Sequence, residues 1–164
     1  MFDDFTHEAF RLETLDDYGR SGNADAYRLF LDGQPKPQGY NSDWLDEVRK
    51  HVDAGRRMYR VHVVSRPLTP YLRYELGWGY TTNMTSGEEF FILDVTDREH
   101  PMPEAPDFWL FDEQVAGVME YDGEGRFLGS ELVEGDQVSG LLAYRDTAMA
   151  QAVPFSDWWA KYGE

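Results

Sequence analysis

The sequence predicts an α/β domain in which a mixed sheet is flanked by helices. From residue 42 to residue 95, helical and strand signals alternate, an order typical of layered α/β domains. From Phe108 to Val133, short strand-like segments separated by turns follow one another, and a helical segment comes after them. The 164 residues are expected to form one domain, with residues 1–41 as N-terminal helices and a loop packed on an α/β core of residues 42–155.

The helices are expected over residues 24–31, 43–54, 70–78 and 136–152. Ser42 or Asp43 can cap the second helix, which has acidic residues in its first turns and basic residues near its end, as the helix dipole favours. Thr69 as N-cap and Pro70 at the first helical position predict the third helix, which we expect to end near Gly77. An apolar face and a following Pro154 indicate the last helix.

The strands are indicated by alternation and by apolar runs. Met58–Ser65 alternates between two faces, and Phe90–Val95 is a second strand. Phe108–Phe111 is continuously apolar, which predicts a strand buried on both faces in the interior of the sheet. Val115–Tyr121 and Arg126–Val133 are separated by a glycine-containing turn and predict a hairpin.

Composition excludes several functional classes. The 15 Lys and Arg residues stand against 31 Asp and Glu, and the resulting net charge of −16 disfavours direct binding to nucleic acids and to anionic membranes. Cysteine is absent, which excludes disulfides, thiolate metal sites and cysteine nucleophiles. The acidic start has no signal-peptide pattern, and no segment approaches the roughly 18 apolar residues of a membrane span. We therefore expect a cytoplasmic protein.

No catalytic motif is present. The histidines are scattered at positions 7, 51, 62 and 100, and no zinc, calcium, phosphate-loop or serine-elbow signature occurs. Pairs of adjacent acidic residues are numerous, but a chain this acidic contains them by chance. The sequence thus predicts no metal, no cofactor and no enzymatic activity.

The distribution of charge is the most informative feature. Residues 49–84 carry seven basic and two acidic residues inside an otherwise acidic chain. Strand alternation places Arg60 and His62 on one face, opposite Tyr59, Val61 and Val63, and Arg66 and Arg73 follow soon after. Two hypotheses account for these arginines: a docking face for a carboxylate-rich partner, or internal pairing with the protein's own Glu75, Asp112 or Glu120.

Several ordered segments carry a resemblance to a known family: Phe10–Thr14, Trp44–Arg49, Gly55–Arg57, Arg60–Leu68, Tyr71–Leu76, Asn83, Gly87–Glu89, Asp107–Asp112 and Gly125–Gly129. Over essentially the whole chain the sequence resembles an uncharacterised actinomycete family known as a domain of unknown function. Members tend to be encoded beside helix-turn-helix regulators and small acidic proteins. The resemblance implies a regulatory neighbourhood and implies neither catalytic residues nor a cofactor.

A weaker similarity connects the chain with one half of the phospholipase D-like fold. The order of a basic-flanked strand, a helix, the run Phe108–Asp112, a hairpin and a closing helix resembles that fold. Those enzymes use a His-x-Lys motif, whereas His62 is followed by Val63-Val64 and no His-x-Lys occurs in the chain. The similarity therefore implies a catalytically inactive relative.

Three functional hypotheses follow. The leading one is a non-enzymatic regulatory or interaction protein that acts with a helix-turn-helix transcriptional regulator or another acidic protein surface. A homo-oligomer of this chain is compatible with that hypothesis. The alternatives are a small-molecule sensor, whose pocket would use aromatics such as Trp78, Tyr80, Trp109 and Tyr121, and an enzyme with an unrecognised carboxylate and arginine site. The candidate partner- or ligand-binding residues are Arg60, His62, Arg66, Arg73, Tyr74, Glu75, Asn83, Trp109 and Asp112.

Overall fold

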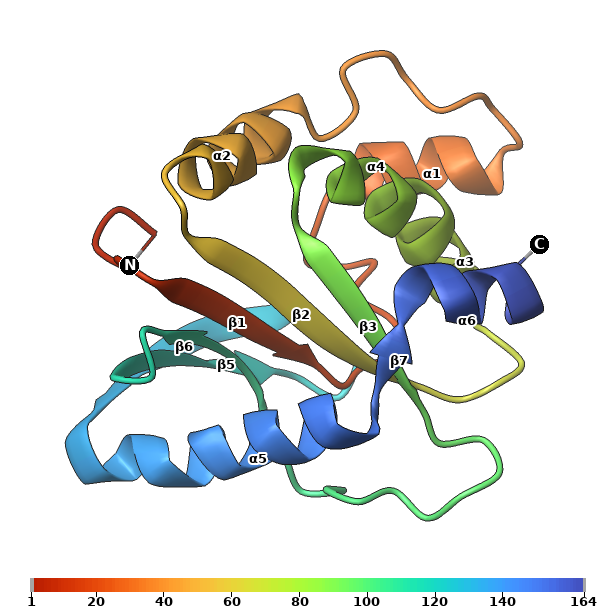
Figure 1. Ribbon diagram of the computed structural model, residues 1–164. Coiled ribbons are helices and arrows are strands. Elements are labelled where there is room, and N and C mark those ends of the chain that lie inside the picture. Colours follow the sequence, from red (N-terminus) through yellow and green to blue (C-terminus); the bar gives the residue numbers. More distant parts are fainter. Residues whose placement is uncertain (1, 164) are drawn as a thin grey trace.

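A seven-stranded mixed sheet forms the centre of the computed structural model, which describes residues 2–163 (Figure 1). The strands are β1 (Glu8–Glu13), β2 (Arg57–Val64), β3 (Glu89–Asp94), β4 (Asp107–Phe111), β5 (Val115–Tyr121), β6 (Phe127–Glu134) and β7 (Val153–Pro154). Their spatial order is β6-β5-β4-β1-β2-β3-β7. Strands β1, β2 and β3 are parallel to one another, and the other neighbours pair in antiparallel fashion. The expected mixed α/β fold is confirmed.

Helices cover both faces of this sheet (Figure 1). One layer contains α1 (Ala24–Leu31), α2 (Ser42–Asp53), α3 (Pro70–Tyr74), the π-helical turn η1 (Glu75–Tyr80), α4 (Thr81–Asn83), the 3-10 turn η2 (Met84–Ser86) and α6 (Phe155–Tyr162). The opposite face carries α5 (Val138–Gln151), which follows the short turn η3 (Gly135–Gln137). Across residues 2–163, none of these helices has both the length and the apolar character that a bilayer crossing requires.

Two unlike layers lie against the two faces of the sheet. Under α5 the packing is apolar, and Phe10, Leu12, Tyr59, Val61 and Phe108 are buried there. Because side chains alternate along a strand, the neighbours of these residues on β1 and β2 point into the other helical layer. That second layer combines an aromatic cluster with buried charged groups.

Several elements lie where the sequence places them. The helix over residues 24–31 is confirmed as α1, and Thr69 caps α3 by accepting a hydrogen bond from the Leu72 backbone N–H at 3.2 Å. Phe108–Phe111 lies in β4 between β1 and β5, which confirms its place in the interior of the sheet. The hairpin of β5 and β6 is also confirmed.

The N-terminal segment differs from expectation. We expected helices and a loop packed on the core, whereas residues 8–13 form β1 in the middle of the sheet. The reason is that β1 is buried on both faces although its sequence, Glu-Ala-Phe-Arg-Leu-Glu, is rich in residues that favour helices. Burial between β2 and β4 outweighs that local preference.

Two helix boundaries also differ. The third helix does not end near Gly77, because the chain continues through the π-helical turn η1 into α4 as far as Asn83. Aromatic side chains on both sides hold this turn in the core; Tyr74 and Tyr80 are both buried. The N-cap of α2 is Asn41 in a left-handed conformation with φ of 57°, rather than Ser42 or Asp43.

Candidate functional site

The helix-covered face of the sheet carries a buried layer of ionisable side chains. In the parallel register of β1 and β2, Arg11 lies opposite Arg60 and Glu13 lies opposite His62. The expected placement of Arg60 and His62 opposite Tyr59, Val61 and Val63 is confirmed. That face is buried beneath helices rather than solvated, since the His62 side chain is 0% exposed.

Arg60 is paired within the protein. Its Nη1 lies 3.1 Å from Oε1 of Glu13, and its Nη2 and Nε donate to Oε2 of Glu88 at 2.6 and 2.9 Å. Trp44 donates its indole N–H to the other oxygen of Glu88 at 2.8 Å. Burial lowers the pKa of Arg60, but the carboxylates of Glu88 and Glu13 outweigh burial and raise that pKa well above its ordinary value. The geometry thus fits internal pairing, with Glu13 and Glu88 as partners instead of Glu75, Asp112 or Glu120.

Arg11 forms the second buried ion pair. Its guanidinium donates to Asp107 at 3.1 Å, and both side chains are almost fully buried. Asp107 also accepts the hydroxyl of Tyr18 at 2.5 Å and the backbone N–H of Thr14 at 3.0 Å. These contacts hold the segment after β1 against β4. Both arginines of this layer are thus paired with carboxylates from other elements.

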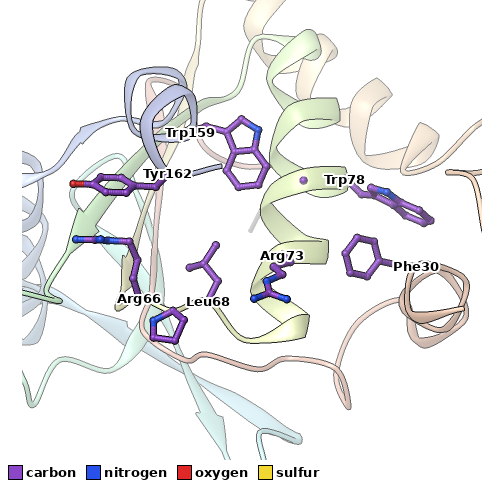
Figure 2. Close-up of a pocket in the computed structure, with 9 residues that line it drawn as sticks. Phe30, Arg66, Leu68, Arg73, Trp78, Trp159 and Tyr162 are labelled. Carbon is purple, nitrogen blue, oxygen red and sulfur yellow. The ribbon is translucent and has the colours of Figure 1, made fainter. Parts of the chain in front are cut away.

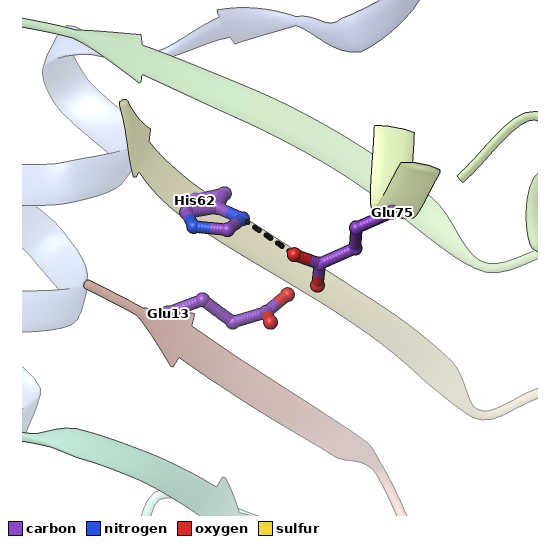
Figure 3. A group of neighbouring side chains, drawn as sticks. All are labelled: Glu13, His62 and Glu75. Carbon is purple, nitrogen blue, oxygen red and sulfur yellow. Dashed lines mark ion pairs between the residues drawn. The ribbon is translucent and has the colours of Figure 1, made fainter. Parts of the chain in front are cut away.

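Glu13, His62 and Glu75 meet between β1, β2 and η1 (Figure 3). Nδ1 of His62 lies 3.6 Å from Oε2 of Glu75, and Nε2 of His62 lies 2.8 Å from the carbonyl oxygen of Leu15. Tyr80 donates its hydroxyl to Oε1 of Glu13 at 2.5 Å. Each of the three residues offers one ligand atom, and these atoms lie within 4.8 Å of one another.

The two glutamates differ in acidity because their neighbours differ. Burial raises the pKa of Glu13, but the charges of His62, Arg60 and Arg11 outweigh burial and hold that pKa well below its ordinary value. Burial raises the pKa of Glu75, and the adjacent Glu13 carboxylate raises it further. Unlike Glu13, Glu75 has a buried oxygen, Oε2, with no hydrogen-bond donor among the described residues.

A cavity of about 490 Å³ lies on the outer side of the same helical layer (Figure 2). Aromatic side chains from α1, η1 and α6 form its walls, and two arginines lie at its edge; the lining residues are Phe30, Arg66, Pro67, Leu68, Arg73, Gly77, Trp78, Trp159 and Tyr162. Of the aromatics that the sequence suggested for a pocket, Trp78 lines this cavity. Tyr80 and Tyr121 instead join the buried network, and Trp109 packs near α2.

The two arginines of the cavity differ in their partners. Arg66 donates to Asp94 at 2.7 Å and to Asp97 at 3.3 Å, and its guanidinium lies 3.9 Å over the Tyr162 ring. Arg73 is exposed, and within residues 2–163 its guanidinium has no carboxylate partner. Arg66 and Arg73 therefore share one site, whereas Arg60 lies in the buried layer and cannot belong to a common docking face with them.

Asp94 is itself held by several donors. Burial raises the pKa of Asp94, but hydrogen bonds from Thr96, from the Trp158 indole and from Arg66 outweigh burial and lower that pKa to about 2. Asp94 therefore connects the end of β3 with α6 and with the arginine at the edge of the cavity.

The remaining predicted site residues have structural contacts. Tyr74 is buried and shares a hydrogen bond of 3.1 Å with the hydroxyl of Tyr40. Asn83 is buried and accepts from the Asn41 side chain at 3.1 Å. Trp109 is half-buried on β4. Asp112 accepts the backbone N–H groups of residues 6–8, which holds the start of β1 and places Asp112 outside both the cavity and the cluster around His62.

Sequence reasoning missed Arg11 and the acidic residues of the buried layer, Glu13, Glu88 and Asp107, and it assigned Tyr80 to a pocket instead of to this layer. The alternation of Phe10 and Leu12 with Arg11 and Glu13 was the available signal for β1. No local signal marks Glu88 or Asp107, because their role depends on which strand lies next to them.

Comparison with known proteins places the chain in a family. No curated protein matches the sequence. The model of a family described as Domain of unknown function (DUF6879) matches residues 1–160, which agrees with the resemblance to a domain of unknown function. Since this match extends over nearly the whole chain, the protein belongs to the DUF6879 family.

Proposed function

We propose that this protein is a non-enzymatic sensor that binds a small organic anion with a flat apolar body. The cavity lined by Phe30, Trp78 and Trp159 carries the proposal. Its volume of about 490 Å³ falls in the range of small-molecule sites, which are mostly apolar with a few polar groups that orient the ligand.

Arg73 indicates the charge of the ligand. The charge of Arg66 is already balanced by Asp94 and Asp97, whereas the guanidinium of Arg73 faces the cavity without a carboxylate among the described residues. A guanidinium pairs best with a planar carboxylate or a phosphate. One anionic group on an aromatic or similarly flat body is therefore the chemistry that this cavity favours.

The positions of the titratable groups support binding rather than catalysis. Glu75, the carboxyl group with the strongly raised pKa, does not line this cavity, and neither do Glu13 and His62. A general acid or base must reach its substrate within hydrogen-bond distance. The imidazole of His62 is also fully buried with Nε2 against a backbone carbonyl, which disfavours a phospholipase D-like role as nucleophile.

Fluorescence titration tests this proposal, because Trp78 and Trp159 report directly from the cavity walls. A panel of aromatic carboxylates and aryl phosphates is titrated into wild type, R73Q and a control, R126Q, which removes an exposed arginine outside the cavity. At least one ligand class should bind wild type and R126Q equally, and R73Q should weaken binding by about 10-fold or more. Equal binding to R73Q, or no binding by any member of the panel, would contradict the proposal.

A second candidate function is docking to a protein partner through β6. This strand lies at the edge of the sheet, and Phe127, Leu128 and Leu132 on it are 42%, 61% and 58% exposed. An unpaired edge with exposed apolar side chains can accept a strand from another chain. The resemblance to actinomycete proteins encoded beside helix-turn-helix regulators makes such a regulator the partner that we propose.

Co-purification distinguishes this candidate from the sensor. Helix-turn-helix regulators from the source genome are co-expressed, one at a time, with wild type, with L132K and with R73Q. Docking through β6 predicts that L132K loses the regulator while R73Q retains it. Retention of the regulator by L132K, or absence of a complex with wild type, would eliminate this candidate.

A further inference from the structure

We propose that Glu13, His62 and Glu75 bind one divalent transition-metal ion, with Zn²⁺ preferred. The three side chains come from β1, β2 and η1, and they converge between the sheet and the helical layer (Figure 3). One imidazole and two carboxylates form a ligand set that suits zinc. The sequence predicted no metal site, because His62 stands alone in the chain and its neighbours in space are 49 and 13 residues away.

The orientation of His62 leaves one ring nitrogen for a cation. A backbone carbonyl only accepts hydrogen bonds, so Nε2, at 2.8 Å from the Leu15 carbonyl oxygen, must carry a proton. Nδ1 is then the ring nitrogen that faces the cluster and can offer its lone pair to a cation. Metal-binding histidines are usually held in this way, with the second nitrogen donating to a carbonyl or carboxylate.

Two atoms that can bind a cation consequently face each other. Nδ1 of His62 and Oε2 of Glu75 are 3.6 Å apart, and Oε2 is buried without a hydrogen-bond donor within residues 2–163. The hydroxyl of Tyr80, 3.3 Å from Nδ1, points its proton to Glu13 at 2.5 Å. A positive charge between Nδ1 and Oε2 would satisfy both atoms.

The spacing favours a metal ion over a proton. A separation of 3.6 Å is too long for a hydrogen bond. Ligand atoms about 2.1 Å from a tetrahedral zinc ion are about 3.4 Å apart, close to the observed separation. The third ligand atom, from Glu13, lies within 4.8 Å of the other two, so a small movement of one carboxylate completes the site.

The balance of charged groups in the buried layer also favours a bound cation. Its four carboxylates belong to Glu13, Glu75, Glu88 and Asp107, and its two guanidinium groups belong to Arg11 and Arg60. The layer therefore holds two more carboxyl groups than guanidinium groups, and a buried cation would offset this excess of acidic groups.

Neighbouring groups position the ligands. Arg60 and Tyr80 both bind Oε1 of Glu13, which leaves its other oxygen without these donors. Glu75 lies on a π-helical turn, a distortion frequently found at functional sites. Its side chain is 12% exposed, so Glu75 is the one member of the cluster whose side chain is not almost fully buried.

Metal content after gel filtration tests the proposal. Wild type, E75Q and E47Q are treated with a chelator, incubated with Zn²⁺ and analysed for bound zinc. E75Q preserves the shape of the side chain, and its Oε2 has no hydrogen bond to lose. E47Q is the matched control, because Glu47 contacts His51 at 2.9 Å but Arg56 occupies the other ring nitrogen.

Wild type and E47Q should retain about one zinc ion per chain, and E75Q should bind zinc at least about 100-fold more weakly. Zinc should also raise the melting temperature of wild type and E47Q but not of E75Q, because an ion bound only to the folded state stabilises it. Circular dichroism without metal verifies that E75Q is folded, and H62N replaces it if it is not. Substoichiometric zinc in wild type, or equal zinc in the ligand variant, would overturn the proposal.

Discussion

Substitution of Arg60 by glutamine removes the cation that two buried carboxylates share. Arg60 binds Glu13 and Glu88, whose side chains are 4% and 0% exposed. Glutamine carries no charge, so R60Q leaves both buried carboxyl groups without the guanidinium that binds them. Of its side-chain hydrogen-bond donors within residues 2–163, Glu88 then keeps only the Trp44 indole N–H.

The expected loss of stability is large because both carboxyl groups are buried away from water. Removal of one partner from a buried ion pair typically costs about 3–5 kcal/mol. In a chain of this length, each kcal/mol corresponds to about 2–4 °C in melting temperature, so R60Q should melt about 6–20 °C below wild type. Salt should change this difference little, because buried pairs are screened far less than exposed ones.

Urea unfolding followed by tryptophan fluorescence and circular dichroism measures the effect. R66Q is the comparison, because its arginine lies at the edge of the cavity and its partner Asp97 is exposed. R66Q should lose much less stability than R60Q. A free energy of unfolding for R60Q within about 1 kcal/mol of the wild-type value would refute the internal pairing. It would also restore the docking hypothesis for Arg60.

Further predictions concern pH, a turn and the core. The pKa of Asp94 is about 2 against an ordinary 3.8, so its stabilising contribution is complete above pH 3.8 and disappears as the pH falls towards 2. Urea unfolding across this range should show that the stability of D94N lacks this part of the pH dependence. Parallel curves of unfolding free energy against pH for D94N and wild type would contradict this prediction. G125A should lose about 1–2 kcal/mol or more, because φ is +82° and a Cβ would lie 2.5 Å from the Asp17 carbonyl oxygen. G123A, with open space around its Cβ, should match wild type in the same thermal melts, and equal losses in both variants would exclude this explanation. F108A should lose about 3–5 kcal/mol, since this ring is fully buried; a loss below about 1 kcal/mol in urea unfolding would contradict its central position.

Local sequence patterns predict those elements whose signals lie within a few residues. Thr69 and Pro70 indicate the start of α3 because capping uses only adjacent backbone groups. The apolar run of β4 indicates burial on both faces for a similar reason. The alternation of β2 is also local, and it correctly separates Arg60 and His62 from Tyr59, Val61 and Val63.

Local patterns do not show what covers a face. For Arg60, the same alternation fits a solvated arginine on a surface and a buried arginine between two glutamates. The choice depends on β1, β3 and the helices above them, which come from distant parts of the chain. The sequence did not predict β1, because its central position in the sheet rather than its composition makes it a strand.

The sequence by itself therefore determines the fold class, most strands and helices, and the excess of acidic residues. The tertiary structure alone decides which charges meet. Glu13 and His62 are 49 residues apart and become neighbours through the parallel register of β1 and β2. Glu75 joins them because the aromatic core holds a π-helical turn above that register. Side chains that converge from three elements carry no shared local pattern, so only packing brings them together.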